Sequence, residues 1–266
     1  MARVSMNEMT TYRWSFEEDV LHYAAAGIRG IGVWRHKLSD YGEEKGIELL
    51  AEHRLQATSL MWGGGFTGSD GRSHRESIDD AKEGLRTAAL LRAPAFVLYT
   101  GGRSGHTHNH ARRLLRSALS ELQPQAEELG VQLVLEPMNE ACAADWTFLT
   151  KLEDAAAMID EWNLASVRLV LDTYHFGHDP AMLEKIPALV PYLGLVHLAD
   201  SRQPPQGEQN RCPLGQGTVP LRSIVQTLRQ AVYDGCYDIE LIGEEIEASD
   251  YHSLLLQSKQ FAESLL

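Results

Sequence analysis

Short apolar runs alternate with longer amphipathic segments along the whole chain. Each apolar run is short enough for a β-strand, and in the segments between them apolar residues recur every three or four positions, as on one face of a helix. We predict strands at 3–7, 28–34, 55–62, 95–99, 133–136, 167–171, 193–196 and 237–240. We predict helices at 15–26, 40–53, 77–91, 110–129, 152–162, 181–189, 221–232 and 251–265.

Local signals support several of these boundaries. Ser15 followed by Glu18 has the spacing of a capping box, which opens a helix, and Gly27 is a natural residue to end it. We predict a flexible glycine loop at 63–65. The segment 200–218 is long and rich in Gly, Pro, Gln and Arg, and long loops in compact domains are usually functional or mobile.

The order of the elements predicts an α/β fold. Strands that alternate with helices form a parallel sheet with right-handed crossovers. Eight such units in 266 residues fit one closed (β/α)8 barrel, so we expect a single TIM barrel domain over residues 1–266. The chain lacks a glycine-rich dinucleotide-binding motif after the first strand, which disfavours an open doubly wound sheet.

Composition limits the possible binding partners and the cellular compartment of the protein. The chain is 44% hydrophobic, enough for one large core, and its formal net charge of −13 argues against nucleic acid as a partner. No apolar run approaches the roughly 20 residues of a membrane span, so we expect no membrane partner. Residues 1–6 lack the apolar core of a signal peptide, and Cys142, Cys212 and Cys236 have no motif spacing. We therefore expect a cytoplasmic protein with free thiols.

Four consecutive predicted strands each present a carboxylate or an imidazole at one end: Glu136, Asp172, His197 and Glu240. The carboxyl ends of parallel strands meet at one mouth of a barrel, which is where such barrels place their chemistry. Three carboxylates and one imidazole suit Mn²⁺, with Mg²⁺ and Co²⁺ as alternatives, and Zn²⁺ is less favoured without thiolates. Any one of these residues could be an ordinary strand-end residue, but four in succession predict a metal site.

Two of the four predicted ligands are also candidates for acid/base chemistry. Three anionic ligands outweigh a divalent charge, so a carboxylate beside the ion can still act as a base. Glu136 and Glu240 come from non-adjacent strands and could flank a substrate on two faces. One would remove a proton from a carbon next to a carbonyl and the other would return it. Glu240 is preferred over the glutamates at 244, 245 and 247 because it lies within the apolar run 239–242.

Five further residues are candidates for substrate binding. His175 follows Asp172 closely and could bind a substrate hydroxyl, although a buried structural histidine is an equal alternative. Arg211, late in the long loop, could close over a substrate oxygen or phosphate, whereas a solvated surface arginine is the plainer interpretation. His106, from the segment after the fourth strand, could line the mouth, with a polar lead-in to the next helix as the alternative. Trp34 and Trp62 could form apolar walls for a sugar ring, with core packing as the alternative.

These motifs together resemble those of the sugar phosphate isomerase/epimerase family. The family consists of xylose isomerase-like TIM barrels and includes ketose 3-epimerases and inosose dehydratases. The resemblance covers nearly the whole chain and rests on the order of the segments 136–139, 172–175, 197–201, 211–217 and 240–243. It implies a Mn²⁺-type ion held by the four strand-end residues, with Glu136 and Glu240 as the acid/base pair. It also implies substrate contacts from His175 and Arg211. Ketose 3-epimerases tend to carry Pro-x-Asn-Arg and a further Glu after the first glutamate, and here Glu140-Ala141-Cys142 follows Asn139 instead.

We therefore expect a divalent-metal enzyme that isomerises or epimerises a small sugar or keto-sugar. A lyase or dehydratase acting on a keto-sugar or inosose, including cleavage of 3-keto-glycosides, is the nearest alternative, because the same enediolate can expel a leaving group. A non-catalytic sugar-binding barrel is a further alternative. The apurinic endonuclease relatives of this barrel would need a His-rich zinc cluster and a basic groove, which the acidic balance disfavours. The sequence leaves a homo-oligomer open.

Overall fold

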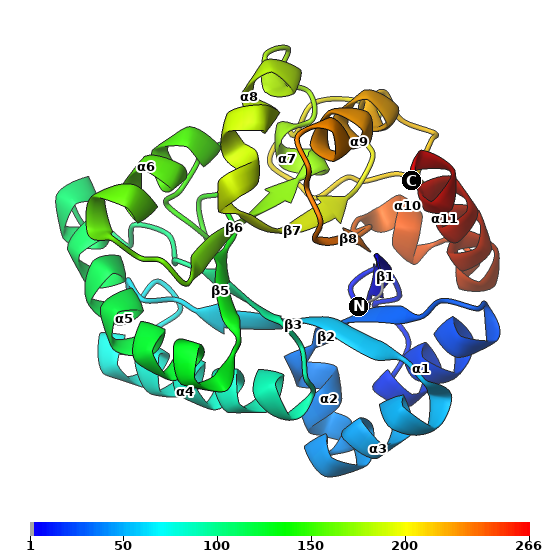
Figure 1. The fold of residues 1–266 in the computed structure, drawn as a ribbon, viewed down its shortest axis with the longest axis horizontal. Helices are drawn as coiled ribbons and strands as arrows, with labels where there is room; N and C mark the ends of the chain where they lie inside the picture. The colour runs from blue at the N-terminus through cyan, green and yellow to red at the C-terminus, as the bar shows by residue number, and fades with distance from the viewer. Residues whose placement is uncertain (1–2) are drawn as a thin grey trace.

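The computed structural model describes residues 3–266, and in these residues eight parallel strands close into a barrel with strands in sequence order (Figure 1). The strands are β1 (Val4–Asn7), β2 (Gly30–Trp34), β3 (Gln56–Gly64), β4 (Ala95–Tyr99), β5 (Gln132–Leu135), β6 (Val167–Asp172), β7 (Leu193–Leu198) and β8 (Cys236–Ile239). Pairing of β1 with β8, from Val4 opposite Tyr237, closes the ring. The predicted (β/α)8 barrel is confirmed. Residues 1 and 2 of the predicted domain lie outside the described residues.

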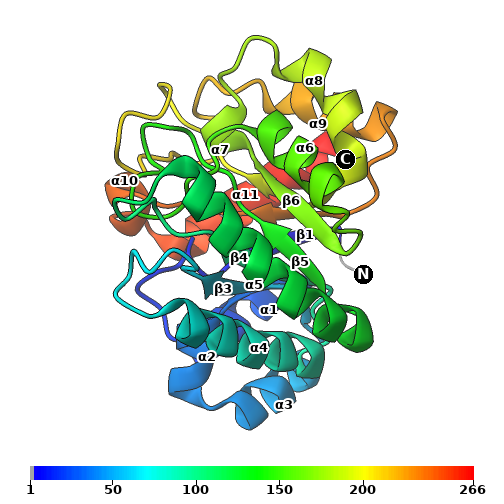
Figure 2. The same ribbon diagram turned by 90° about the vertical axis from the view of Figure 1, so that its left-hand side faces the viewer.

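Helices surround the strands on the outside of the ring (Figures 1 and 2). They are α1 (Phe16–Ala25), α2 (Arg35–Tyr41), α3 (Glu43–His53), α4 (His74–Leu90), α5 (His108–Leu129), α6 (Leu152–Trp162), α7 (Thr173–Phe176), α8 (Met182–Leu189), α9 (Leu221–Gln230), α10 (Glu244–Glu247) and α11 (Tyr251–Leu265), with a 3₁₀ turn η1 (Val190–Tyr192). The short helices α7 and α10 follow the ends of β6 and β8 and were not predicted. Within residues 3–266, no helix combines the length and the apolar character that a membrane crossing requires.

Capping explains where two helices begin. The predicted capping box of α1 is confirmed: the Ser15 side chain accepts a hydrogen bond from the Glu18 amide, and Glu18 accepts one from the Ser15 amide. Ser73 and Glu76 form a second capping box. This second box starts α4 at residue 74 rather than at the predicted residue 77, because the cap satisfies the free amides of the first turn.

The structure differs from the predicted elements at two glycines. The predicted helix 40–53 is divided between α2 and α3 at Gly42, whose φ of 104° lies outside the helical region. The predicted flexible loop at 63–65 was wrong for its first two residues, which are the last residues of β3. A Cβ on Gly63 would come within 2.5 Å of the Phe96 ring, so this glycine allows close packing between β3 and β4.

The apolar core has two parts. A large cluster fills the space between the barrel wall and the helices. A smaller cluster fills the barrel interior and includes Met61, Val97, Val134, Val170, Leu195 and Cys236. Three of these interior residues, Val134, Val170 and Leu195, come two positions before Glu136, Asp172 and His197 on their strands. Because side chains alternate along a strand, the polar residues lie directly above this apolar layer, at the mouth.

Candidate metal centre

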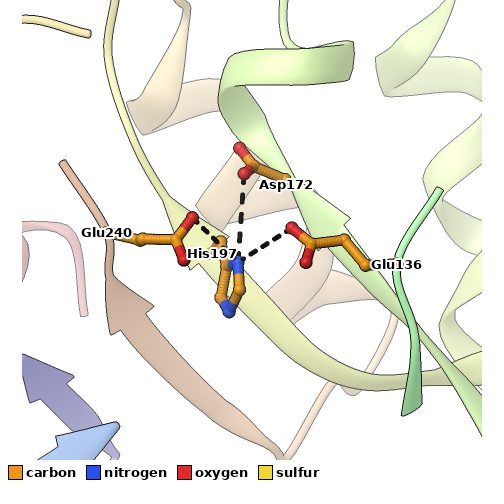
Figure 3. A group of neighbouring side chains, drawn as sticks. All are labelled: Glu136, Asp172, His197 and Glu240. Carbon is orange, nitrogen blue, oxygen red and sulfur yellow. Dashed lines mark ion pairs between the residues drawn. The ribbon is translucent and has the colours of Figure 1, made fainter. Parts of the chain in front are cut away.

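Glu136, Asp172, His197 and Glu240 meet at the mouth of the barrel. Each offers a ligand atom, these atoms all lie within 4.8 Å of one another, and all four residues are buried. Figure 3 shows the three carboxylates pointing toward the His197 ring from the ends of different strands. The structure thus brings together the four residues of the predicted metal site, which we call the metal cluster.

The strand register places these side chains. Asp172 pairs with His197 across β6 and β7, and His197 pairs with Asp238 on β8. The amide of Glu136 donates to the Leu98 carbonyl, and the amide of Glu240 donates to Leu198, each at 3.1 Å. The ladder therefore continues one residue past β5 and β8, and this fixes both glutamates on the inward face.

His197 lies at the centre of the metal cluster. Its Nδ1 is 3.4 Å from Glu136 Oε1, 3.4 Å from Glu240 Oε2 and 3.9 Å from Asp172 Oδ2. Burial alone would lower the pKa of His197, but the Glu240 and Glu136 carboxylates outweigh it and raise that pKa well above its ordinary value. The excess of negative charge around this ring is the environment that a cation would neutralise.

The hydrogen-bond inventory of the cluster fits a bound cation. Among the described residues, Glu136 Oε2, Glu240 Oε1 and both ring nitrogens of His197 are buried without a hydrogen-bond partner. Buried polar atoms are nearly always paired, and an ionised carboxylate is costly to bury unpaired. Three carboxylates with one imidazole are a donor set for a divalent ion such as Mn²⁺, Mg²⁺, Co²⁺ or Zn²⁺. The cluster could therefore hold a divalent metal.

Arg211 is buried against the same cluster. Its guanidinium lies 2.6 Å from Glu240 Oε2 and 2.9 Å from Asp172 Oδ2, and 5.0 Å above the ring of Tyr174. Burial would raise the pKa of Glu240, but His197 and Arg211 lower it well below its ordinary value. Burial raises the pKa of Glu136, which has no contact of this kind with the arginine. Arg211 is thus an integral part of the site rather than a surface residue.

The long loop that carries Arg211 is fixed at several points. The Asp200 carboxylate accepts hydrogen bonds from the amides of Gly215, Gly217 and Val219 at 2.9 to 3.2 Å. The amide of Arg211 donates to the Ile242 carbonyl at 3.0 Å. These bonds hold the loop against the end of β8, so the arginine reaches the cluster from a defined backbone position.

His175 lies beside the cluster on α7. It is 2% exposed, and within the described chain neither of its ring nitrogens has a hydrogen-bond partner. Burial lowers its pKa to about 4, and the charges of Asp172 and Arg211 act on it in opposite directions. The imidazole is therefore neutral at pH 7 and has a donor and an acceptor available. Its predicted contact with substrate stays a prediction.

The other three predicted substrate contacts come from β2, from β3 and from the segment after β4, not from the strands that carry the metal cluster. His106 Nε2 is 3.2 Å from the Thr67 carbonyl in the loop after β3, and a role for it in binding stays a prediction. Trp34 and Trp62 are half-buried at the mouth ends of β2 and β3 and pack against the interior apolar cluster. Their indole nitrogens are buried without a hydrogen-bond partner in the described residues.

The prediction missed Asp238, which lies below the cluster. Its Oδ2 is 3.9 Å from His197 Nε2, on the side of the ring opposite the three carboxylates. Asn7 donates to Asp238 at 2.8 Å, Ser5 also donates to it, and the missing Cβ of Gly32 leaves room for its carboxylate. Strand alternation could have found this residue, because Asp238 precedes Glu240 by two positions and so shares its inward face.

Comparison with known proteins identifies the family. Residues 20–264 match the family profile described as the xylose isomerase-like TIM barrel. The chain belongs to this family. It is 28% identical over 248 residues to the D-psicose 3-epimerase of Enterocloster bolteae, covering 86% of this chain and 76% of that protein. It is 27% identical over 256 residues to the ketose 3-epimerase of Arthrobacter globiformis, covering 88% and 84%.

Solved structures share the fold at lower identity. A protein from Sinorhizobium meliloti 1021 has a TM-score of 0.89 at 23% identity, with 99% of this chain and 98% of that chain covered. The IOLI protein, crystallised with a bound zinc atom, has a TM-score of 0.85 at 20% identity, with coverage of 99% and 97%. At these identities the likeness supports the barrel fold alone.

Proposed function

We propose that this protein is a divalent-metal-dependent sugar isomerase or epimerase that moves a proton on a carbon next to a carbonyl. The observation that carries the proposal is the placement of two buried glutamates, Glu136 and Glu240, on non-adjacent strands around one metal cluster. Each has one carboxylate oxygen without a hydrogen-bond partner in the described residues. Two carboxylates in this arrangement suit proton removal on one side of a substrate and proton return on the other.

The proposed ion is Mn²⁺, with Mg²⁺, Co²⁺ and Zn²⁺ as alternatives, and its ligands are the four residues of the metal cluster. A bound divalent ion supplies positive charge that polarises a carbonyl and stabilises the negative charge of an enediolate. The zinc atom in the IOLI protein belongs to that protein and supports only the general suitability of this barrel for a divalent ion.

The side chains around the cluster have distinct proposed tasks. Glu136 and Glu240 exchange the proton. The neutral His175 offers a hydrogen bond to a substrate hydroxyl, because both its nitrogens are free within the described chain and its ring is buried beside the cluster. Arg211 binds a substrate oxygen while it keeps Asp172 and Glu240 in place. The apolar layer below the cluster excludes water from the reacting carbon.

The relatives support a small-molecule carbohydrate as the substrate. Both curated relatives are named as epimerases of ketoses, and each aligns with more than four-fifths of this chain. The substrate class that they suggest is a ketose or keto-sugar. Glu140-Ala141-Cys142 follows Asn139 in place of the Arg and the further substrate-contacting glutamate of ketose 3-epimerases, so that contact is missing here.

Solvent deuterium exchange tests the proposal. Mn²⁺-loaded protein is incubated in D₂O with ketoses, ketose phosphates, inososes and 3-keto-glycosides, and each recovered compound is analysed by mass spectrometry. Deuterium at a carbon next to a carbonyl, lost on metal removal and in Glu136→Gln, is the expected result. Loss of water or of an aglycone would assign the lyase reaction instead. No exchange with any compound would favour a sugar-binding barrel without catalysis.

A further inference from the structure

A second cavity opens at the mouth, across the barrel from the metal cluster. It has a volume of about 590 Å³ and is lined chiefly by Trp34, Arg35, Trp62, Arg72, Tyr99 and Trp146. These residues lie on or after β2, β3, β4 and β5, whereas the cluster is formed at the ends of β5 to β8, and Figure 1 shows β2 and β3 on the side of the ring opposite β6 and β7. None of the four metal-cluster residues lines this cavity. We call it the aromatic cavity.

Aromatic side chains in the wall of this cavity contact one another. The rings of Trp62 and Trp146 are 5.6 Å apart, and the ring of Tyr99 meets Trp146 edge-on at 5.9 Å. Trp146 comes from the loop between β5 and α6, and 40% of it is exposed. An exposed tryptophan held between two other aromatic side chains presents a flat face on which another ring can stack.

The polar groups of the cavity favour an uncharged ligand. Arg72 lies 2.6 Å from Asp70 and 2.9 Å from Asp80, and Asp80 also pairs with Arg35 at 2.8 Å. The two arginines are therefore balanced by two carboxylates, and no cation remains unpaired among these four side chains to bind a phosphate. The other polar residues of the lining are His36 and Ser39, whose ring nitrogens and hydroxyl suit hydroxyl or ether oxygens.

The aromatic cavity is connected to the metal cluster through Trp34 and Trp62. Both side chains pack against the interior apolar cluster, which contains Val134, Val170 and Leu195. These three residues lie one layer below Glu136, Asp172 and His197 on the same inward faces. Trp34 and Trp62 thus contact both the aromatic cavity and the apolar layer directly below the metal cluster.

We propose that the aromatic cavity binds a second, uncharged ring attached to the sugar that reacts at the metal cluster, so that the substrate is a keto-sugar glycoside rather than a free sugar. This inference rests on the proposed function of the cluster. The volume supports it, because ligand pockets range from roughly 300 to 1,000 Å³ and this cavity alone reaches that range without the space over the metal ligands. The attached ring is either an aryl group or a second sugar, since both stack on aromatic faces.

Calorimetric titration of the metal-loaded protein tests this inference with three probes: 3-keto-D-glucose, phenyl 3-keto-β-D-glucoside and 3-keto-cellobiose. The expected result is that at least one ring-bearing probe binds about tenfold more tightly than 3-keto-D-glucose, as one stacking contact can provide. Preference for the phenyl glycoside identifies an aryl ring, and preference for 3-keto-cellobiose identifies a sugar ring. Equal affinity for all three probes, or no binding of any, would overturn the inference.

Two variants and a control assign that preference to the cavity. Trp146→Ala should reduce the ratio between the affinity for the preferred ring-bearing probe and the affinity for 3-keto-D-glucose toward one. Trp146→Phe should restore part of this ratio because a ring remains. Trp146 is partly exposed, so its truncation removes little buried area. Leu90→Ala is the matched control, because Leu90 is 61% exposed at the end of α4, just before β4 begins at the other end of the barrel. An unchanged ratio in Trp146→Ala would contradict the assignment.

These experiments distinguish a failure of the second-ring site from a failure of the proposed reaction at the metal cluster. Ring-dependent binding without deuterium exchange would reject the proposed reaction and retain the second-ring site. Deuterium exchange with equal affinity for the free sugar and both glycosides would retain the reaction and reject the second-ring site.

Discussion

The Arg211 guanidinium contacts the Glu240 carboxylate at 2.6 Å, and the two side chains are 1% and 2% exposed. The same arginine lies 2.9 Å from Asp172, so one buried positive charge pairs with two proposed metal ligands. Such a buried pair is costly to break from one side, because the remaining charge loses its partner. Arg211 therefore links the stability of the cluster to its affinity for a cation.

Replacing Arg211 by Ala should have opposite effects on stability and on metal affinity. The metal-free protein should lose about 3–5 kcal/mol of unfolding free energy, because Asp172 and Glu240 are left buried and unpaired. Affinity for Mn²⁺ should stay equal or rise, because no side-chain cation competes for these oxygens, while kcat/KM for the sugar falls. Urea unfolding, metal titration and the exchange assay measure these three quantities.

Arg202→Ala is the control for this experiment. Arg202 lies in the same loop and pairs with Glu245, but its side chain is 51% exposed. Exposed pairs contribute little, so the control should change neither stability nor metal affinity appreciably. Loss of metal affinity in Arg211→Ala, or an unchanged kcat/KM, would contradict the assigned role.

Asp238 should fix the orientation of the His197 ring. Its carboxylate faces His197 Nε2 at 3.9 Å, which favours a proton on that nitrogen and leaves the Nδ1 lone pair for the ion. Asp238→Asn should weaken Mn²⁺ or Zn²⁺ binding by about 10- to 100-fold, the usual effect of losing such a partner. Nitrogen NMR of the imidazole in the Zn²⁺-loaded proteins should show Nε2–H with Nδ1 bound to the ion in the wild type, and a smaller population of this form in the variant.

Asp234→Asn serves as the matched control for Asp238→Asn, because Asp234 is exposed in the turn just before β8. It should bind metal as the wild type does. Equal metal affinity in wild type and Asp238→Asn, with the same imidazole form in both, would show that Asp238 has only a packing role.

Glu8 should make stability depend on pH independently of the metal. It is fully buried after β1, and burial, followed by the nearby Asp19, raises its pKa well above the ordinary value. The unfolded chain releases this proton near its ordinary pKa of about 4.3, whereas the folded chain retains it. The contribution of protonated Glu8 to the stability of the folded chain is therefore complete below about pH 4.3, and it is lost as pH rises through the folded pKa.

Glu8→Gln removes this titration and keeps an acceptor for the Trp34 amide, which Glu8 now binds at 2.6 Å. Stability of the variant relative to the wild type should increase with pH, by about 1.4 kcal/mol per pH unit until the folded pKa is reached. Urea unfolding of the metal-free proteins at pH 4 to 8 measures the difference. The exposed Glu17→Gln should show a constant offset, and a constant offset for Glu8→Gln would refute the prediction.

The barrel and the grouping of four residues at its mouth could be predicted because both follow from local rules. Strands that alternate with helices impose parallel order, and parallel order brings all carboxyl ends to one face. Glu136, Asp172, His197 and Glu240 needed only their positions at strand ends to be placed together. The same rule extended by one inward layer would have placed Asp238.

The remaining features depend on contacts between segments far apart in the sequence. Nothing in the composition of the long loop shows that Arg211 turns inward to Asp172, 39 residues earlier. Gly63 looked like a loop residue because its role is set by the Phe96 ring on the next strand. Trp146 gave no signal, since its partners Trp62 and Tyr99 come from two other strands.

The central claim is that Glu136, Asp172, His197 and Glu240 bind one divalent ion at the mouth of the barrel. Titration of chelator-stripped protein with Mn²⁺, with free ion followed by electron paramagnetic resonance, tests it most directly. We predict one ion per chain in the wild type and in Glu245→Gln, because the Glu245 carboxylate pairs with Arg202 at the surface. We predict strongly weakened binding in Glu240→Gln. Undiminished binding in Glu240→Gln, or no binding in the wild type, would contradict it.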